Sequence, residues 1–84
     1  MTPPIVLLHG WGLSAAVWNP LRAHFSPAQT IHAQDLPGHG SAAPAGDTLE
    51  SWADALVATL PDKALVVGWS LGGMLALHIA RHYP

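Results

Sequence analysis

The sequence predicts an α/β fold in which three short parallel strands alternate with helices in the order β-α-β-α-β-α. Strand-like runs at residues 5–8, 30–34 and 64–67 are separated by segments with helical spacing of apolar residues. Parallel strands need crossovers of this kind, which are right-handed. The first run is continuously apolar, as in a strand that is buried on both faces, and the third is an apolar, strand-like run.

The first unit begins with the run 5–8, which His9-Gly10 closes. Ser14 is the expected N-cap of a helix that extends to about Phe25, and Pro20 predicts a kink or a late start within it. The apolar residues expected on one face of this helix are Val17, Trp18, Leu21 and Phe25.

The second unit is the strand at 30–34, the turn at 35–40 and the loop at 41–46. Asp47 and Glu50 have the spacing of a capping box, which predicts the start of the next helix. The residues that follow helical spacing from there are Leu49, Trp52, Ala53, Leu56, Val57 and Leu60.

The third unit carries the most informative motif, Gly68-Trp69-Ser70-Leu71-Gly72-Gly73. It lies between the strand at 64–67 and a helical pattern from Leu71 to His82. A G-x-S-x-G sequence between a strand and a helix predicts a nucleophile elbow, a sharp turn that exposes the serine hydroxyl. Glycine is needed two residues on either side because a Cβ there would collide with the packed strand and helix.

The motif predicts Ser70 as a catalytic nucleophile. The backbone N–H of Leu71, at the helix start, is one expected donor for a developing oxyanion. The loop His9-Gly10-Trp11-Gly12 is the expected source of a second donor, the N–H of Trp11 or of Gly12. If the first strand lies between the second and the third, the two loops are neighbours at the carboxyl edge of the sheet.

Several residues are expected to support this site. Gly10 and Gly12 let the loop backbone approach a substrate closely, and His9 is expected to hold the loop by hydrogen bonds. Asp35 is expected to fix its turn through the carboxylate. Trp69 is expected to pack beside the nucleophile, where it is a candidate to touch substrate.

The residues after Ser70 do not supply a general base. They include no Asp or Glu, and the two histidines, His78 and His82, lie about 12 and 18 Å along the helix axis from the serine. Their spacing is that of two metal ligands, but Ile79 stands where the HExxH pattern needs Glu. We expect no metal site, and no turnover by residues 1–84 alone.

Composition indicates that the chain is part of a larger domain. Half of the 84 residues are hydrophobic and only 10% are charged, against about 25% in ordinary soluble domains. We therefore expect residues 1–84 to be the N-terminal part of a domain whose lid and C-terminal part are absent. We expect this piece to be poorly soluble alone.

Charge and hydropathy argue against several classes of partner. A net charge of −2 with three Lys and Arg residues argues against binding to nucleic acid or to an anionic membrane. There is no cysteine, no signal-peptide pattern, and no apolar run near the roughly 20 residues of a membrane span. We expect a cytoplasmic protein that is monomeric when complete.

The motifs 9–12, 35–41 and 68–73 together resemble the α/β-hydrolase superfamily, and the first and last are most similar to the carboxylesterases of biotin synthesis. The resemblance implies a parallel three-stranded portion of an α/β-hydrolase core and no cofactor. It implies hydrolysis, through an acyl-enzyme on Ser70, of the methyl ester of a pimeloyl chain carried by acyl carrier protein. Trp11 and Leu71 would contact the substrate at the oxyanion hole.

Three alternatives remain open from the sequence. Other serine hydrolases of the superfamily, including lactonases and carbon–carbon bond hydrolases, share these motifs. The segment 10–15 also fits the G-x-G-x-x-A pattern of a dinucleotide-binding module, with Asp35 near the place of a ribose-binding acid. The third alternative is a non-catalytic remnant.

Overall fold

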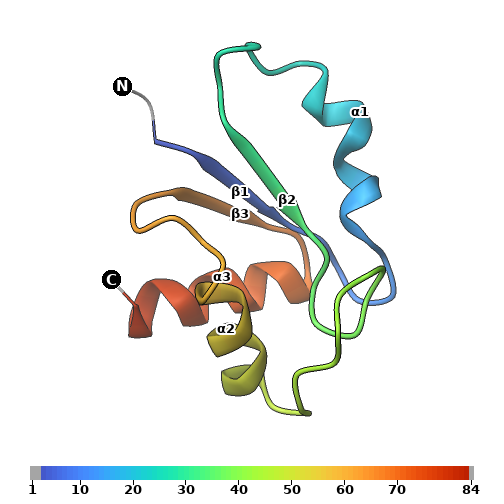
Figure 1. Cartoon of the computed structure of the whole chain (residues 1–84), viewed down its shortest axis with the longest axis vertical. Coiled ribbons are helices and arrows are strands. Elements are labelled where there is room, and N and C mark those ends of the chain that lie inside the picture. The colour runs from blue at the N-terminus through green and yellow to red at the C-terminus, as the bar shows by residue number, and fades with distance from the viewer. Residues whose placement is uncertain (1–2, 84) are drawn as a thin grey trace.

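The computed structural model describes residues 3–83 and has the predicted alternation of strands and helices (Figure 1). A short 3-10 helix, η1, precedes the first α-helix. The elements in chain order are β1 (Ile5–Leu8), η1 (Ala15–Trp18), α1 (Asn19–Arg22), β2 (Ile31–Gln34), α2 (Leu49–Val57), β3 (Leu65–Gly68) and α3 (Leu71–His82).

The strands form one parallel sheet in the order β2-β1-β3. Leu8, the last residue of β1, is paired with Gln34 on one side and Gly68 on the other. The three strands therefore end at one edge of the sheet. The first strand thus has the central position on which the expected proximity of the two motif loops depended.

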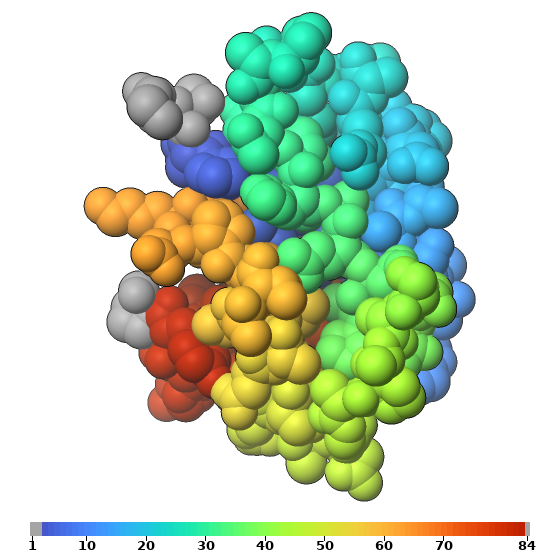
Figure 2. All heavy atoms as spheres, viewed as in Figure 1, coloured from blue at the N-terminus to red at the C-terminus, as the bar shows by residue number. Residues whose placement is uncertain are grey.

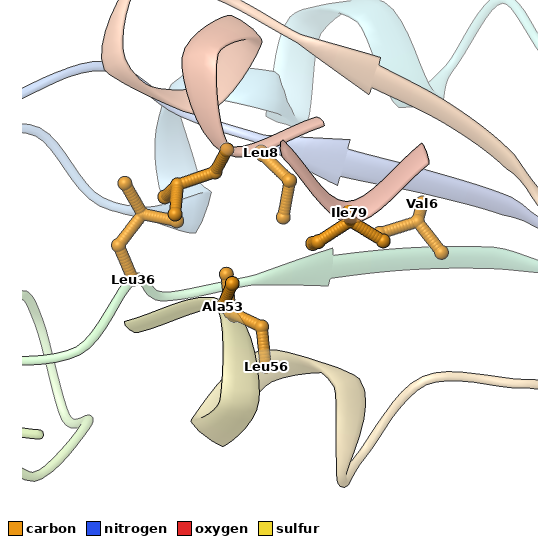
Figure 3. Close-up of a cluster of buried hydrophobic side chains, with 7 residues drawn as sticks. Val6, Leu8, Leu36, Ala53, Leu56 and Ile79 are labelled. Atoms are coloured by element: carbon orange, nitrogen blue, oxygen red, sulfur yellow. The ribbon is translucent and has the colours of Figure 1, made fainter. Parts of the chain in front are cut away.

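The core lies between the sheet and helices α2 and α3 (Figure 3). Val6 and Leu8 of β1 are fully buried there against side chains of both helices. Leu7, between them, is also buried but lies outside this cluster, because successive strand residues face opposite sides of a sheet. The opposite side is where η1 and α1 lie (Figure 1). The buried members of the cluster are Val6, Leu8, Leu36, Ala53, Leu56, Leu75 and Ile79.

The prediction of a single helix from Ser14 to about Phe25 is wrong in the length and the type of the helix. Ser14 does cap the segment, since its side chain accepts a hydrogen bond from the Ala16 N–H. However, the first turn is the 3-10 helix η1, and α1 restarts with Pro20 at its beginning and ends at Arg22. Proline lacks an N–H and favours the first turn of a helix, which explains the late start.

The predicted capping box of α2 is displaced by one residue. The N-cap is Thr48, whose Oγ1 accepts from the Ser51 N–H at 3.0 Å, while Ser51 Oγ accepts from the Thr48 N–H at 3.3 Å. Asp47 and Glu50 do not form this pair. Helix α2 also ends at Val57 rather than near Leu60.

One face of β3 is open. Leu65 is 55% exposed and Val67 is also exposed on this face, where η1 packs against β1 and β2. On the other side, a groove of about 1200 Å³ runs between β3 and α3, and its lining includes Leu77 and Ser70. None of the helices among residues 3–83 is long and apolar enough to cross a membrane.

Candidate active site

Ser70 has the backbone geometry of a strained, exposed turn. Its φ of 56° and ψ of −114° lie outside the regions that residues other than glycine normally adopt, and no other non-glycine residue among 3–83 has a positive φ. Such a conformation costs about 1–3 kcal/mol and occurs mainly at functional sites. The side chain is exposed, and within the described chain its hydroxyl makes no hydrogen bond. A free hydroxyl is therefore presented at the end of β3.

The two flanking glycines make this turn sterically feasible, as expected. A Cβ on Gly68 would overlap the backbone of Gly72 and Gly73, and a Cβ on Gly72 would overlap the carbonyl groups of Leu8 and His9. The turn is closed by the Gly72 N–H, which donates to the Trp69 carbonyl oxygen at 3.0 Å. Helix α3 can therefore start immediately after Ser70.

Leu71 is the first residue of α3, and its N–H has no acceptor among residues 3–83. The first amides of a helix are not used in its internal hydrogen bonds, and the helix dipole makes them favourable sites for negative charge. This amide is therefore free to bind an anionic oxygen beside Ser70.

The loop after β1 forms a tight turn from Gly10 to Leu13, and His9 stabilises it. The Gly10 carbonyl oxygen accepts from the Leu13 N–H at 3.3 Å and from His9 Nδ1 at 2.8 Å. His9 is fully buried, and its Nε2 accepts from the Leu36 N–H at 2.9 Å. An amide only donates, so this ring is neutral with its proton on Nδ1. His9 thus joins the loops after β1 and β2.

The same bonds orient the amide of Trp11. It shares a trans peptide group with the Gly10 carbonyl, so its N–H points away from the two donors that hold that oxygen. Within residues 3–83 it has no acceptor of its own. A Cβ built on Gly10 would lie 3.5 Å from Ser70 Cβ, which places this loop directly against the elbow.

The alternative second donor, the N–H of Gly12, is already engaged. It donates to Nε2 of His39 at 3.0 Å. Of the two amides that the sequence left open, only that of Trp11 is free. The loops after β1 (blue) and β2 (green) lie side by side at the right of the molecule (Figure 2), in agreement with this bond.

Asp35 fixes the loop after β2, as expected. Its carboxylate accepts from the Ala15 N–H at 2.7 Å and from the N–H and hydroxyl of Ser41, both at 3.1 Å. These bonds, first the one from Ala15, hold the pKa of Asp35 below its ordinary value. The carboxylate is not free for a ribose, which argues against the dinucleotide-binding alternative.

Aromatic side chains from other elements contact the Trp11 indole. The Trp11 indole is 72% exposed and lies nearly parallel to that of Trp52 in α2, with ring centroids 6.4 Å apart. The His39 ring is edge-on to both. Trp69, beside Ser70, is 54% exposed. The sequence did not identify Trp52 or His39 as neighbours of Trp11, because Trp52 was recognised only by helical spacing and no motif related His39 to the loop after β1.

No general base for Ser70 is found among residues 3–83. His78 and His82 form a pair on α3 with ring centroids 4.4 Å apart, several turns after the elbow. In the described chain, no three His, Asp or Glu side chains are grouped as metal ligands. Among the described residues the site therefore has an exposed serine hydroxyl without a hydrogen-bonded histidine or carboxylate, and two free amides.

Comparisons with known proteins agree with this geometry. Relatives named pimeloyl-[acyl-carrier protein] methyl ester esterase are 50% identical in Aromatoleum aromaticum, 45% in a Shewanella species and 43% in Vibrio campbellii. Each alignment includes 98% of this chain and 33%, 31% and 33% of the respective relative. The chain thus spans about a third of the length of the curated relatives it matches.

A solved structure shows the same fold. The crystal structure of a haloalkane dehalogenase loop variant, DbeA-M1 from Bradyrhizobium elkanii, has a TM-score of 0.84 and 28% identity, covering 99% of this chain and 30% of that one. The sequence profile described as the alpha/beta hydrolase family matches residues 5–83. The chain belongs to the alpha/beta hydrolase family.

Proposed function

We propose that the whole protein is a serine carboxylesterase that hydrolyses the methyl ester of a pimeloyl chain carried by acyl carrier protein. The observation that carries the proposal is the exposed Ser70 hydroxyl in its strained turn, flanked by the free amides of Leu71 and Trp11. The choice of substrate is based on relatives of 43–50% identity that are named pimeloyl-[acyl-carrier protein] methyl ester esterase. Their resemblance extends through both loops of the site.

In the proposed reaction, Ser70 Oγ attacks the ester carbonyl carbon and gives its proton to a histidine base. The negative charge that develops on the carbonyl oxygen is stabilised by the N–H groups of Leu71 and Trp11. The C–O bond then breaks, and methanol leaves with the proton returned by the base. Water hydrolyses the acyl-enzyme to release the carboxylate and free Ser70. The proposal requires that the base and its acidic partner come from other parts of the whole protein.

The exposed indoles of Trp11 and Trp69 are proposed to contact the substrate beside the reacting carbonyl. His9, Gly10 and Gly12 are proposed to support the loop that presents the Trp11 amide. No cofactor is needed for this chemistry. A cytoplasmic, monomeric protein that binds neither nucleic acid nor membrane is also part of the proposal, supported by the low positive charge of the chain.

The experiment is to incubate the whole protein with pimeloyl-acyl carrier protein methyl ester and to measure methanol and the free carboxylate. We expect both products in equal amounts, and none from Ser70→Ala. A methyl ester of the same chain without the carrier protein serves as the comparison. Equal rates on the two esters would contradict the proposed substrate and leave a general esterase. No hydrolysis of any ester would contradict the activity itself.

A further inference from the structure

The site contains a histidine that the proposed reaction does not use. His39 lies in the loop after β2, and its Nε2 accepts the Gly12 N–H at 3.0 Å. Its Nδ1 lies 3.1 Å from the carbonyl oxygen of Pro37. Because an amide only donates and a carbonyl only accepts, both bonds form together only when the ring is neutral and its proton is on Nδ1. One protonation state thus joins the β2 loop to the β1 loop.

The bond from His39 reaches the central peptide of the Gly10–Leu13 turn. Gly12 is the third residue of this turn and has a φ of +75°, the requirement of a type II turn. The Gly12 N–H belongs to the peptide that joins Trp11 to Gly12. This peptide has opposite orientations in type I and type II turns. An acceptor for the Gly12 N–H therefore favours one of the two turn types over the other.

Two tryptophans hold the His39 ring in place. Its centroid is 5.3 Å from that of Trp11 and 5.7 Å from that of Trp52, with the ring at 80° to both. Edge-to-face contacts at this distance are favourable. Trp52 is fixed in turn, since its Nε1 donates to the carbonyl oxygen of Gly46 at 2.9 Å. The histidine would lose these contacts if it turned away from Gly12.

We propose that His39 is a positioning residue for the oxyanion-binding loop. By accepting the Gly12 N–H, it engages that amide and fixes the turn from Gly10 to Leu13, which carries the Trp11 N–H as its free amide. The inference rests on the proposed function. It predicts that loss of the acceptor lowers the stabilisation of the transition state and leaves binding of the ground state almost unchanged.

The test compares two substitutions in the whole protein. His39→Phe keeps an aromatic ring between Trp11 and Trp52 but removes the acceptor, whereas His39→Gln retains an acceptor oxygen. Removing an oxyanion donor outright costs about 10²–10³-fold in kcat, so we expect about a tenfold loss for His39→Phe, where the donor is only misaligned. KM should change little, and His39→Gln should recover most of kcat. His24→Phe is the control, because His24 is exposed and its side chain makes no hydrogen bond within residues 3–83.

The amide resonance of Gly12 gives a second readout that does not depend on turnover. We expect its hydrogen exchange to be slow in the unmodified protein and in His39→Gln, and fast in His39→Phe. Equal losses of kcat in the Phe and Gln variants, or no loss in either, would overturn the positioning role while Ser70 chemistry stands. Fast exchange of Gly12 in the unmodified protein would also overturn it. Absence of any esterase activity, with Gly12 still protected, would instead contradict the proposed function.

Discussion

Gly72 of α3 lies directly against the carbonyl group of Leu8 at the end of β1, so that helix and strand meet backbone to backbone. A Cβ at this position would overlap the Leu8 and His9 carbonyls, which are held in the sheet and in the loop that follows it. Neither backbone can shift without moving Ser70 or Trp11. This contact couples the start of α3 to both loops of the site.

Gly72→Ala should therefore lower the free energy of unfolding by at least about 3 kcal/mol, the upper range for overpacking. Urea denaturation of the whole protein measures this. Gly10→Ala is the control, because a Cβ there would meet its neighbours at 3.4 Å or more, an ordinary contact distance. Similar losses for the two variants would show that the close approach at Gly72 is not what requires glycine.

Asp35 should make stability depend on pH at the acid end. Because its pKa is lowered on folding by the bonds from Ala15 and Ser41, its contribution is present above the unfolded value, about 3.9. It is lost as the pH falls from there through the lower folded value. Asp35→Asn should remove this part of the pH dependence and cost about 1–2 kcal/mol at neutral pH. The test is to measure the free energy of unfolding of the unmodified protein and of Asp35→Asn between pH 2 and pH 7, with Asp62→Asn as the control. If the difference between the unmodified protein and Asp35→Asn stays constant with pH, the prediction is wrong.

Thr48→Ala should remove the capping box of α2. The loss of a threonine N-cap costs about 1 kcal/mol, while Asp47→Ala should cost less than about 0.5 kcal/mol since Asp47 is outside the box. Thermal unfolding of the two variants side by side makes the comparison. A larger loss of stability for Asp47→Ala than for Thr48→Ala would contradict this and favour the capping box of Asp47 and Glu50 that the sequence predicted.

The strands and α3 could be predicted from the sequence because their signals are local. Continuous apolar runs mark β1 and β3, and the spacing from Leu71 to His82 matches α3 residue for residue. The start of α2 could not be fixed in the same way. Both 47/50 and 48/51 have suitable spacing, and the bond from the Trp52 indole to the carbonyl group of Gly46, six residues earlier, is not one that helical spacing reveals.

In the candidate site too, residues in local motifs could be predicted from the sequence, whereas long-range contacts could not. Ser70, Leu71 and the loop from His9 to Gly12 belong to short motifs whose geometry is local, so the sequence could predict them as candidates. The choice between Trp11 and Gly12 as the free amide depended on His39, which is 27 residues from Gly12 in the chain. Trp52 likewise reaches Trp11 only through the packing of α2. Contacts of this range follow from the fold and not from residue spacing.

The central claim is that Ser70 is the nucleophile, and a fluorophosphonate probe tests it most directly. After reaction with the whole protein, peptide mapping by mass spectrometry should find a single adduct on Ser70. The adduct should be absent from Ser70→Ala and retained in Ser26→Ala, whose serine is exposed and distant in sequence. An adduct that persists in Ser70→Ala would contradict the account.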